Sequence, residues 1–201
     1  MNFKEVSDFY NNRFIESGDN INSVGWKSKQ DQFLRFEILL RGFDLHNKSF
    51  LDVGCGLGGF IDFLNFKKIK GYKYLGIDIS NNLLDFAKLK YQKNKNVEFR
   101  LGEILEMNFL KRKFDFVIAS GAFSYNSLNM DVYAIKSIKK MFLISDIACS
   151  ANFLSSYSDF QLKKNKHYSP ELIFSKSKEI TKKVTLIHDY PLYEFTIQLK
   201  R

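Results

Sequence analysis

A chain of 201 residues, 45% of them apolar, has the length and composition of one globular domain. Its net charge of +9 is spread over short lysine groups such as Lys67-Lys68 and Lys182-Lys183, which is typical of solvated faces and disfavours a nucleic-acid partner. Cys55 and Cys149 have no metal-ligand spacing. The chain starts without a signal-peptide pattern, and no apolar run approaches the ~18 residues that span a bilayer. We therefore expect a cytoplasmic protein with no metal site and no membrane partner.

Two helices are predicted before the first strand. Apolar residues recur at three- and four-residue intervals over residues 3–16 and again over residues 31–40. The polar stretch between the two helices contains the only tryptophan of the chain, Trp26. We interpret the whole chain as one domain, in which a helical lid of residues 1–45 precedes a core of residues 48–201.

From residue 49 onward, short apolar strands alternate with helices. The helix after the second strand begins at Ser80, a residue type that caps helix N-termini. Such alternation is typical of a parallel sheet covered by helices on both faces. The predicted strands are residues 49–53, 74–78, 97–100, 114–119 and 141–146, and the predicted helices are residues 60–66, 80–91 and 132–140.

The last part of the chain departs from this alternation. Two β-rich runs, residues 184–190 and 192–199, are separated by little more than Pro191. A crossover helix has no room between them, so the two strands must be antiparallel. The sequence therefore predicts a three-layer α/β sandwich, with a mostly parallel sheet that ends in an antiparallel C-terminal hairpin.

A glycine loop, GCGLGG, follows the first predicted strand. Gly54, Gly56 and Gly59 fit the G-x-G-x-x-G pattern of dinucleotide-binding loops, in which the backbone turns sharply and lies against the ligand. Asp52 argues against a dinucleotide, because an apolar residue normally occupies this strand position and an unpaired buried carboxylate is costly. A ligand that brings positive charge to the loop explains this aspartate, and S-adenosylmethionine carries an ammonium and a sulfonium.

Four segments resemble, in order, those of class I S-adenosylmethionine-dependent methyltransferases. Residues 52–58 (DVGCGLG) resemble motif I of that family, and Asp78 resembles the acid that ends its second strand. Residues 102–104 (GEI) resemble the segment that meets the adenine, and residues 114–121 (FDFVIASG) resemble the fourth strand. The resemblance implies a Rossmann-like fold, with a seven-stranded sheet whose last strand is antiparallel to the other six. It also implies S-adenosylmethionine as the cofactor.

The resemblance implies a role for several of these residues. Asp78 is expected to accept hydrogen bonds from both ribose hydroxyls, Glu103 from the adenine amine, and the backbone N–H of Ile104 is expected to reach a ring nitrogen. The two ends of the chain, residues 23–36 and 188–196, also resemble a subgroup of small bacterial methyltransferases. The predicted cofactor-binding residues are Trp26, Arg35, Asp52, Gly54, Cys55, Gly56, Asp78, Ile79, Glu103, Ile104 and Ser120.

Arg35 and Trp26 each have two interpretations. Arg35 pairs with the carboxylate of the cofactor while Trp26 covers it, or Arg35 lies over Phe36 and Trp26 packs under a loop. The pattern of residues leaves both open.

A general base is optional in methyl transfer, because an acceptor amine can lose its proton to water. His188 lies in the last residues of a strand, 184–190, predicted to be parallel to the rest of the sheet and therefore to point to its ligand-binding edge, so it is a candidate base or a structural residue. Tyr125, after the fourth strand, is the other catalytic candidate or else a wall of the substrate pocket. His167 is expected in a loop and His46 at the surface.

The acceptor is predicted to be a small molecule or a saccharide that is methylated on oxygen. The chain has no appended recognition domain, and residues 119–123 (ASGAF) lack the Asp/Asn-Pro-Pro-Tyr/Phe segment of nucleic-acid amino methyltransferases. An RNA or protein methyltransferase that uses the positive charge is the alternative, and lysines at the mouth of the pocket would favour it. A non-catalytic S-adenosylmethionine-binding protein is the third possibility.

Overall fold

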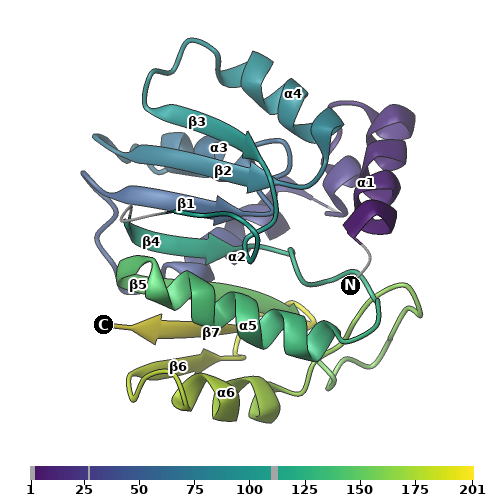
Figure 1. Ribbon diagram of the computed structural model, residues 1–201, viewed down its shortest axis with the longest axis vertical. Coiled ribbons are helices and arrows are strands. Elements are labelled where there is room, and N and C mark those ends of the chain that lie inside the picture. The colour runs from purple at the N-terminus through teal and green to yellow at the C-terminus, as the bar shows by residue number, and fades with distance from the viewer. Residues whose placement is uncertain (1–2, 27, 110–112) are drawn as a thin grey trace.

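Seven strands form one sheet in the computed structural model, which describes residues 3–26, 28–109 and 113–201 (Figure 1). The sheet order is β3-β2-β1-β4-β5-β7-β6. β7 is antiparallel to both β5 and β6, and the other neighbours are parallel, which confirms the predicted Rossmann-like sheet. The strands are β1 (Ser49–Val53), β2 (Lys73–Asp78), β3 (Val97–Leu101), β4 (Phe114–Ala119), β5 (Ser145–Leu154), β6 (Val184–Ile187) and β7 (Glu194–Lys200).

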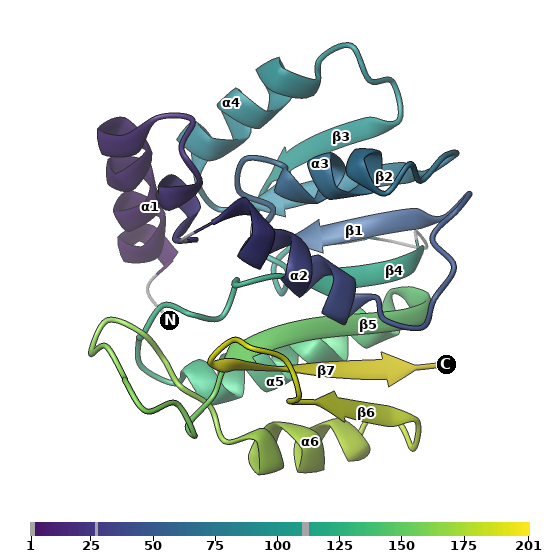
Figure 2. The same cartoon turned by 180° about the vertical axis from the view of Figure 1, so that it is seen from behind.

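Helices cover both faces of the sheet and make the outer layers of the sandwich. The helices α2 (Lys29–Leu39), α3 (Gly59–Phe66) and α4 (Asn81–Tyr91) bury apolar side chains in the core on one face. The opposite face is covered by α5 (Met130–Leu143) and α6 (Pro170–Lys178). Figure 1 shows α5 in front of the sheet, and Figure 2 shows α2 and α3 in front of it. Among the described residues, no helix is both long enough and apolar enough to cross a membrane.

Alternation along the central strands creates a separate core on each face. In β1, Phe50 packs with the α2 and α3 side chains, whereas Leu51 packs with those of α5. The same alternation holds for Phe116 and Val117 of β4, because successive strand residues point to opposite faces. The central strands are therefore apolar almost throughout, as a sheet buried on both faces requires.

The N-terminal helix α1 (Phe3–Ser17) lies outside these layers. It packs on α4 and on the short 3-10 helix η1 (Ile21–Val24), beyond the carboxyl ends of β1, β2 and β3 (Figures 1 and 2). α2 instead packs against α3, β5 and β7. Residues 1–45, the predicted lid, thus contribute α1 and η1 beyond this edge of the sheet, while α2 reaches the edge with its first turns, where Gln32 and Arg35 lie.

Several regions differ from the predicted elements. The strand predicted over residues 184–190 ends at Ile187, so residues 188–190 lie outside β6. Residues 141–143 were expected to begin a strand, but they form the last turn of α5, because Met141 continues the apolar face of Ala134 and Ile138. The strand itself runs from Ser145 to Leu154. The sequence analysis also missed α6, which has Pro170 in its first turn and Ser169 as its N-cap.

Candidate active site

The glycine loop joins β1 to α3 at the carboxyl edge of the sheet. Gly54 has a φ of 72°, a conformation that L side chains rarely adopt. A Cβ at Gly54 would lie 2.8 Å from the Cβ of Ala122, in the loop that follows β4. The loop therefore needs glycine here both for its backbone conformation and for the close approach of the neighbouring chain.

Asp52, the penultimate residue of β1, is buried beneath this loop. The hydroxyl of Tyr74 donates a hydrogen bond to its carboxylate at 2.9 Å. Burial, together with the nearby charge of Asp78, raises the pKa of Asp52 to about 7, whereas the hydrogen bond from Tyr74 lowers it. No cation pairs with this carboxylate in the part of the chain that the structure describes.

Asp78 ends β2 on the far side of the loop, as predicted. One of its carboxylate oxygens accepts a hydrogen bond from the backbone N–H of Gly56 at 2.8 Å, and the other accepts one from Ser80 at 2.9 Å. Burial raises its pKa, and these backbone donors oppose that effect. Each carboxylate oxygen can accept more than one hydrogen bond, so both keep capacity for ligand hydroxyls.

Glu103 follows β3, and Tyr133 of α5 is its unforeseen partner. The Tyr133 hydroxyl donates to one carboxylate oxygen at 2.7 Å, and the backbone N–H of Leu105 donates to the other at 2.9 Å. Burial, followed by the hydrogen bond to Glu103, raises the pKa of Tyr133. These contacts hold the carboxylate at the edge of the sheet.

These residues surround an inner cavity that encloses about 880 Å³ of empty space, its open mouth included. All of the predicted cofactor-binding residues except Arg35 line it. The Ser120 hydroxyl, directly after β4, is buried there and has no hydrogen-bond partner among the residues that the structure describes. A buried polar atom in this state is costly unless a ligand supplies its partner. The remaining lining residues are Val6, Tyr10, Val24, Gln32, Phe36, Val53, Ile77, Leu83, Gly102, Gly121, Ala122 and Tyr133.

A second, outer cavity of about 1750 Å³, again including open solvent, adjoins the inner one. The two cavities share Tyr10, Val24, Trp26 and Gly121 as lining residues. The wall of the outer cavity is rich in aromatic rings. It comes from α1, residues 24–26, α2, the loop after β4, β5, residues 158–167 and residues 191–194. Its further aromatic lining residues are Phe9, Tyr125, Phe153, Phe160 and Tyr193.

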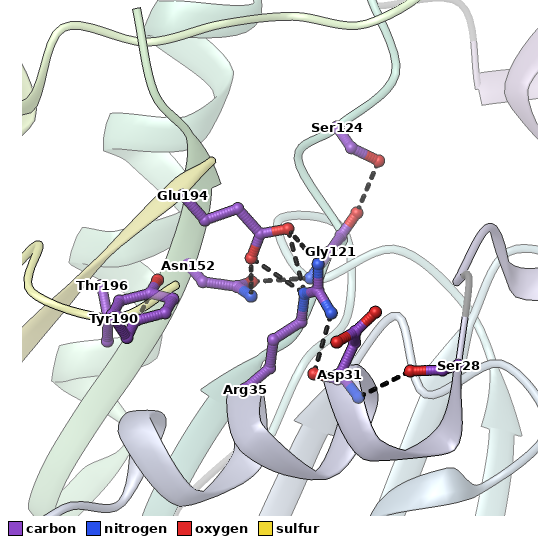
Figure 3. A network of polar contacts seen from close by, with 9 residues as sticks. All are labelled: Ser28, Asp31, Arg35, Gly121, Ser124, Asn152, Tyr190, Glu194 and Thr196. Atoms are coloured by element: carbon purple, nitrogen blue, oxygen red, sulfur yellow. Dashed lines mark hydrogen bonds and ion pairs between the residues drawn. The ribbon is translucent and has the colours of Figure 1, made fainter. Parts of the chain in front are cut away.

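Arg35 lines the outer cavity, and its partner is Glu194 of β7. Its Nε and NH2 atoms donate to the Glu194 carboxylate at 2.7–3.0 Å, and NH1 donates to the carbonyl of Asp31 at 2.8 Å (Figure 3). Its guanidinium also lies over the ring of Trp26, 4.1 Å from the centroid. Arg35, for which a cofactor carboxylate and packing over Phe36 were both left open, therefore forms a buried ion pair within the protein, because β7 brings Glu194 to it.

The structure separates the candidate bases. His188 directly follows β6, but it is exposed, packs against Tyr157 and Phe195, and lines neither cavity. His188 lies at the expected carboxyl edge of the sheet. However, β6 is the outermost strand, so His188 lies at the side of the sheet and away from the cavities. Tyr125 does line the outer cavity, where its hydroxyl donates to Glu5 at 3.0 Å.

His167, expected only as a loop residue, is the histidine that lines the outer cavity. The backbone N–H of Lys166 donates to the carbonyl of Ser124 at 2.9 Å, and the Tyr168 hydroxyl donates to that of Phe123 at 2.9 Å. These bonds hold the segment against the loop that follows β4. Burial lowers the pKa of His167, which favours its neutral form.

Sequence reasoning missed four site residues: Tyr10, Tyr133, His167 and Glu194. Only Glu194 carried a usable signal, since a carboxylate directly before the apolar and β-branched residues Phe195–Ile197 of β7 needs a partner, as Asp52 does in β1. Tyr10 and Tyr133 belonged to ordinary amphipathic patterns. Their roles depend on which face of each helix meets the cavity.

The chain is similar in sequence and in fold to known methyltransferases. Residues 50–142 match the family model described as "Methyltransferase domain". Rv1506c of Mycobacterium tuberculosis, whose name describes it as a methyltransferase, is 32% identical over 162 residues, 76% of this chain and 93% of that protein. Demethylmenaquinone methyltransferase of Lactococcus lactis is 32% identical over 119 residues, 58% of this chain but only 46% of that protein. The fold also matches a SAM-dependent methyltransferase structure from Aquifex aeolicus, with a TM-score of 0.65 at 18% identity, over 89% of this chain and 95% of that one.

Proposed function

We infer the acceptor from the premise that this chain belongs to the class I, Rossmann-like S-adenosylmethionine-dependent methyltransferases, with S-adenosylmethionine as its cofactor. The inner cavity has the donors and acceptors that this cofactor needs. Asp52 would take its ammonium, Asp78 its ribose hydroxyls, and Glu103 with Ile104 its adenine. The unpartnered Ser120 hydroxyl would bind at the methionine end. When bound, S-adenosylmethionine supplies an electrophilic methyl group on its sulfonium.

Cofactor binding is expected to weaken as the pH falls below 7. With a pKa of about 7 in the free protein, Asp52 is mostly protonated at lower pH, and only its ionised form attracts an ammonium. At pH 5.5 the affinity for S-adenosylhomocysteine should be about 30-fold lower than its value above pH 7, where it levels off. Isothermal titration between pH 5.5 and 8.5 measures this. In Asp52→Asn the slope should disappear, and a slope that persists there would assign the titration to another group.

The proposed acceptor is a small molecule or a saccharide, methylated on oxygen. The observation that carries this is the junction of the two cavities, where an acceptor in the outer one meets the cofactor at Tyr10, Trp26 and Gly121. A concave cavity with aromatic rings beside amide and hydroxyl groups suits a diffusible, partly polar molecule. The name of the Lactococcus relative also specifies a small molecule, demethylmenaquinone.

The charges of the outer cavity argue against an RNA acceptor. Arg35 is neutralised by Glu194, and Asp31 adds negative charge beside it. The described cations that remain in the wall are Arg13 and Lys164, which do not form the stripe of lysines and arginines that tracks a phosphate backbone.

We propose that His167 accepts the proton of an acceptor hydroxyl. It lines the outer cavity, and its lowered pKa keeps the imidazole neutral and able to take a proton at pH 7. Tyr10 stands at the junction of the cavities, where burial raises the pKa of its hydroxyl. Tyr10 therefore stays protonated and would orient the acceptor by hydrogen bonding. Tyr125 would contribute to the wall.

A release assay for S-adenosylhomocysteine tests this function. The purified chain is incubated with S-adenosylmethionine and three acceptor sets: hydroxylated small molecules and saccharides, total RNA, and a protein extract. Release should exceed the acceptor-free background only with the first set. Release with RNA or protein alone would overturn the acceptor class. Binding of S-adenosylhomocysteine without release in any set would favour a cofactor-binding protein that has lost catalysis.

A further inference from the structure

A closed circuit of contacts surrounds the junction of the two cavities. The backbone N–H of Gly121 donates to Asn152 of β5 at 2.8 Å, and the side-chain amide of Asn152 donates to Glu194 at 2.8 Å (Figure 3). Glu194 binds Arg35, and Arg35 lies over the ring of Trp26. The Trp26 ring in turn lies against Gly121, so closely that a Cβ there would be 2.5 Å from it. The circuit therefore returns to the residue at which it began.

Stability alone does not account for the charged pair in this circuit. The side chains of Arg35 and Glu194 are only 10% and 6% exposed. Removing two charges from water is expensive, and apolar residues of similar volume often stabilise a protein as well or better. The pair does fix the orientation of the Arg35 side chain. The guanidinium donates to the carboxylate from two nitrogens and lies over the indole ring at the same time, which an apolar pair or a lysine would not do.

Trp26 and Gly121 are the two residues of this circuit that bear on methyl transfer. Trp26 and Gly121 line both cavities, and Gly121 directly follows Ser120, which lines the inner one. Transfer between the cavities is an in-line displacement, so the position of this partition controls the alignment of the reacting groups. We propose that Arg35, Glu194 and Asn152 are positioning residues, which hold Trp26 against Gly121 as the partition between the cofactor and the acceptor. This inference rests on the placement of the cofactor and holds for any acceptor.

Trp26 is the only tryptophan of the chain, so its fluorescence reports on the partition directly. In the unaltered protein, S-adenosylhomocysteine should change the emission of Trp26 and protect it from acrylamide. In Arg35→Lys the charge pair with Glu194 can persist, but the planar stacking is lost. Trp26 should then become more accessible to acrylamide, and the affinity for S-adenosylhomocysteine should fall about tenfold, at a melting temperature close to that of the unaltered protein.

Two further variants complete the test. Glu194→Gln keeps the shape of the side chain but removes the charge that holds Arg35, and it should expose Trp26 in the same way. Asp189→Asn makes the same chemical change in the exposed pair with Arg41 and should leave Trp26 unchanged. The proposal is overturned if both Arg35→Lys and Glu194→Gln leave the acrylamide quenching of Trp26 and its response to S-adenosylhomocysteine unaltered. Failure of both variants to fold would also overturn it, since the circuit would then serve folding.

Discussion

Replacing Asp78 by alanine should weaken the binding of S-adenosylmethionine and S-adenosylhomocysteine by about 10²- to 10⁴-fold. In the proposed complex the carboxylate accepts a hydrogen bond from each ribose hydroxyl, and charge-assisted bonds of this kind contribute about 1.5–3 kcal/mol each. The substitution also removes the acceptor for the backbone N–H groups of Gly56 and Ser80, which shape the loop around the ligand. Isothermal titration calorimetry measures the loss.

Asp146→Ala is the matched control for this prediction. Asp146 lies at the start of β5, and its exposed carboxylate pairs with Lys113, so its loss should leave the affinity unchanged. Circular dichroism and thermal melting separate loss of binding from loss of fold. A folded Asp78→Ala variant that binds S-adenosylhomocysteine as tightly as the unaltered protein would show that the ribose lies elsewhere.

Replacing His167 by alanine should lower the turnover of a hydroxyl acceptor by about 10²- to 10⁴-fold, the usual contribution of a positioned proton acceptor. The affinity for S-adenosylhomocysteine should stay nearly the same, because His167 lines only the outer cavity. Since burial lowers the pKa of His167 from the ordinary histidine value of 6.5, the imidazole is neutral at any pH above 6.5. Turnover should therefore be constant above this pH and fall in acid, as the imidazole becomes protonated. The rates are measured with the acceptor identified by the release assay.

His188→Ala is the control, because it removes the same side chain from an exposed position outside both cavities. It should leave turnover unchanged. If His188→Ala lowers turnover and His167→Ala does not, the two assignments must be exchanged. If neither affects turnover, proton removal is left to solvent, as methyl transfer to an amine permits.

The lining of the inner cavity was predictable because many of its residues are consecutive or lie at strand ends. Carboxyl ends of parallel strands meet at one edge of a sheet, so Asp52, Asp78, Glu103 and Ser120 had to lie together once the strands were recognised. The helix boundary at Ser80 was predictable for a similarly local reason, because its hydroxyl accepts the N–H of Leu83.

Elements whose limits depend on partners were less predictable. Residues 141–143 have the composition of a strand, yet they complete α5. Met141 lies on the buried face of that helix with Ala134 and Ile138 and packs in the same core. Helix α6 is a short helix whose apolar side is visible only against the sheet it covers. Periodicity over so few residues does not distinguish a helix from a loop.

The sequence by itself determined the fold class, the glycine loop and the acids that line the inner cavity, because each follows from local pattern and strand order. Only the tertiary structure decided the partner of Arg35, which is a glutamate 159 residues away, and which histidine faces the outer cavity. The physical reason is that both outcomes depend on how β7 and the segment around His167 fold back over the carboxyl edge. Such contacts between distant segments arise from packing of the whole chain and leave no periodic trace in it.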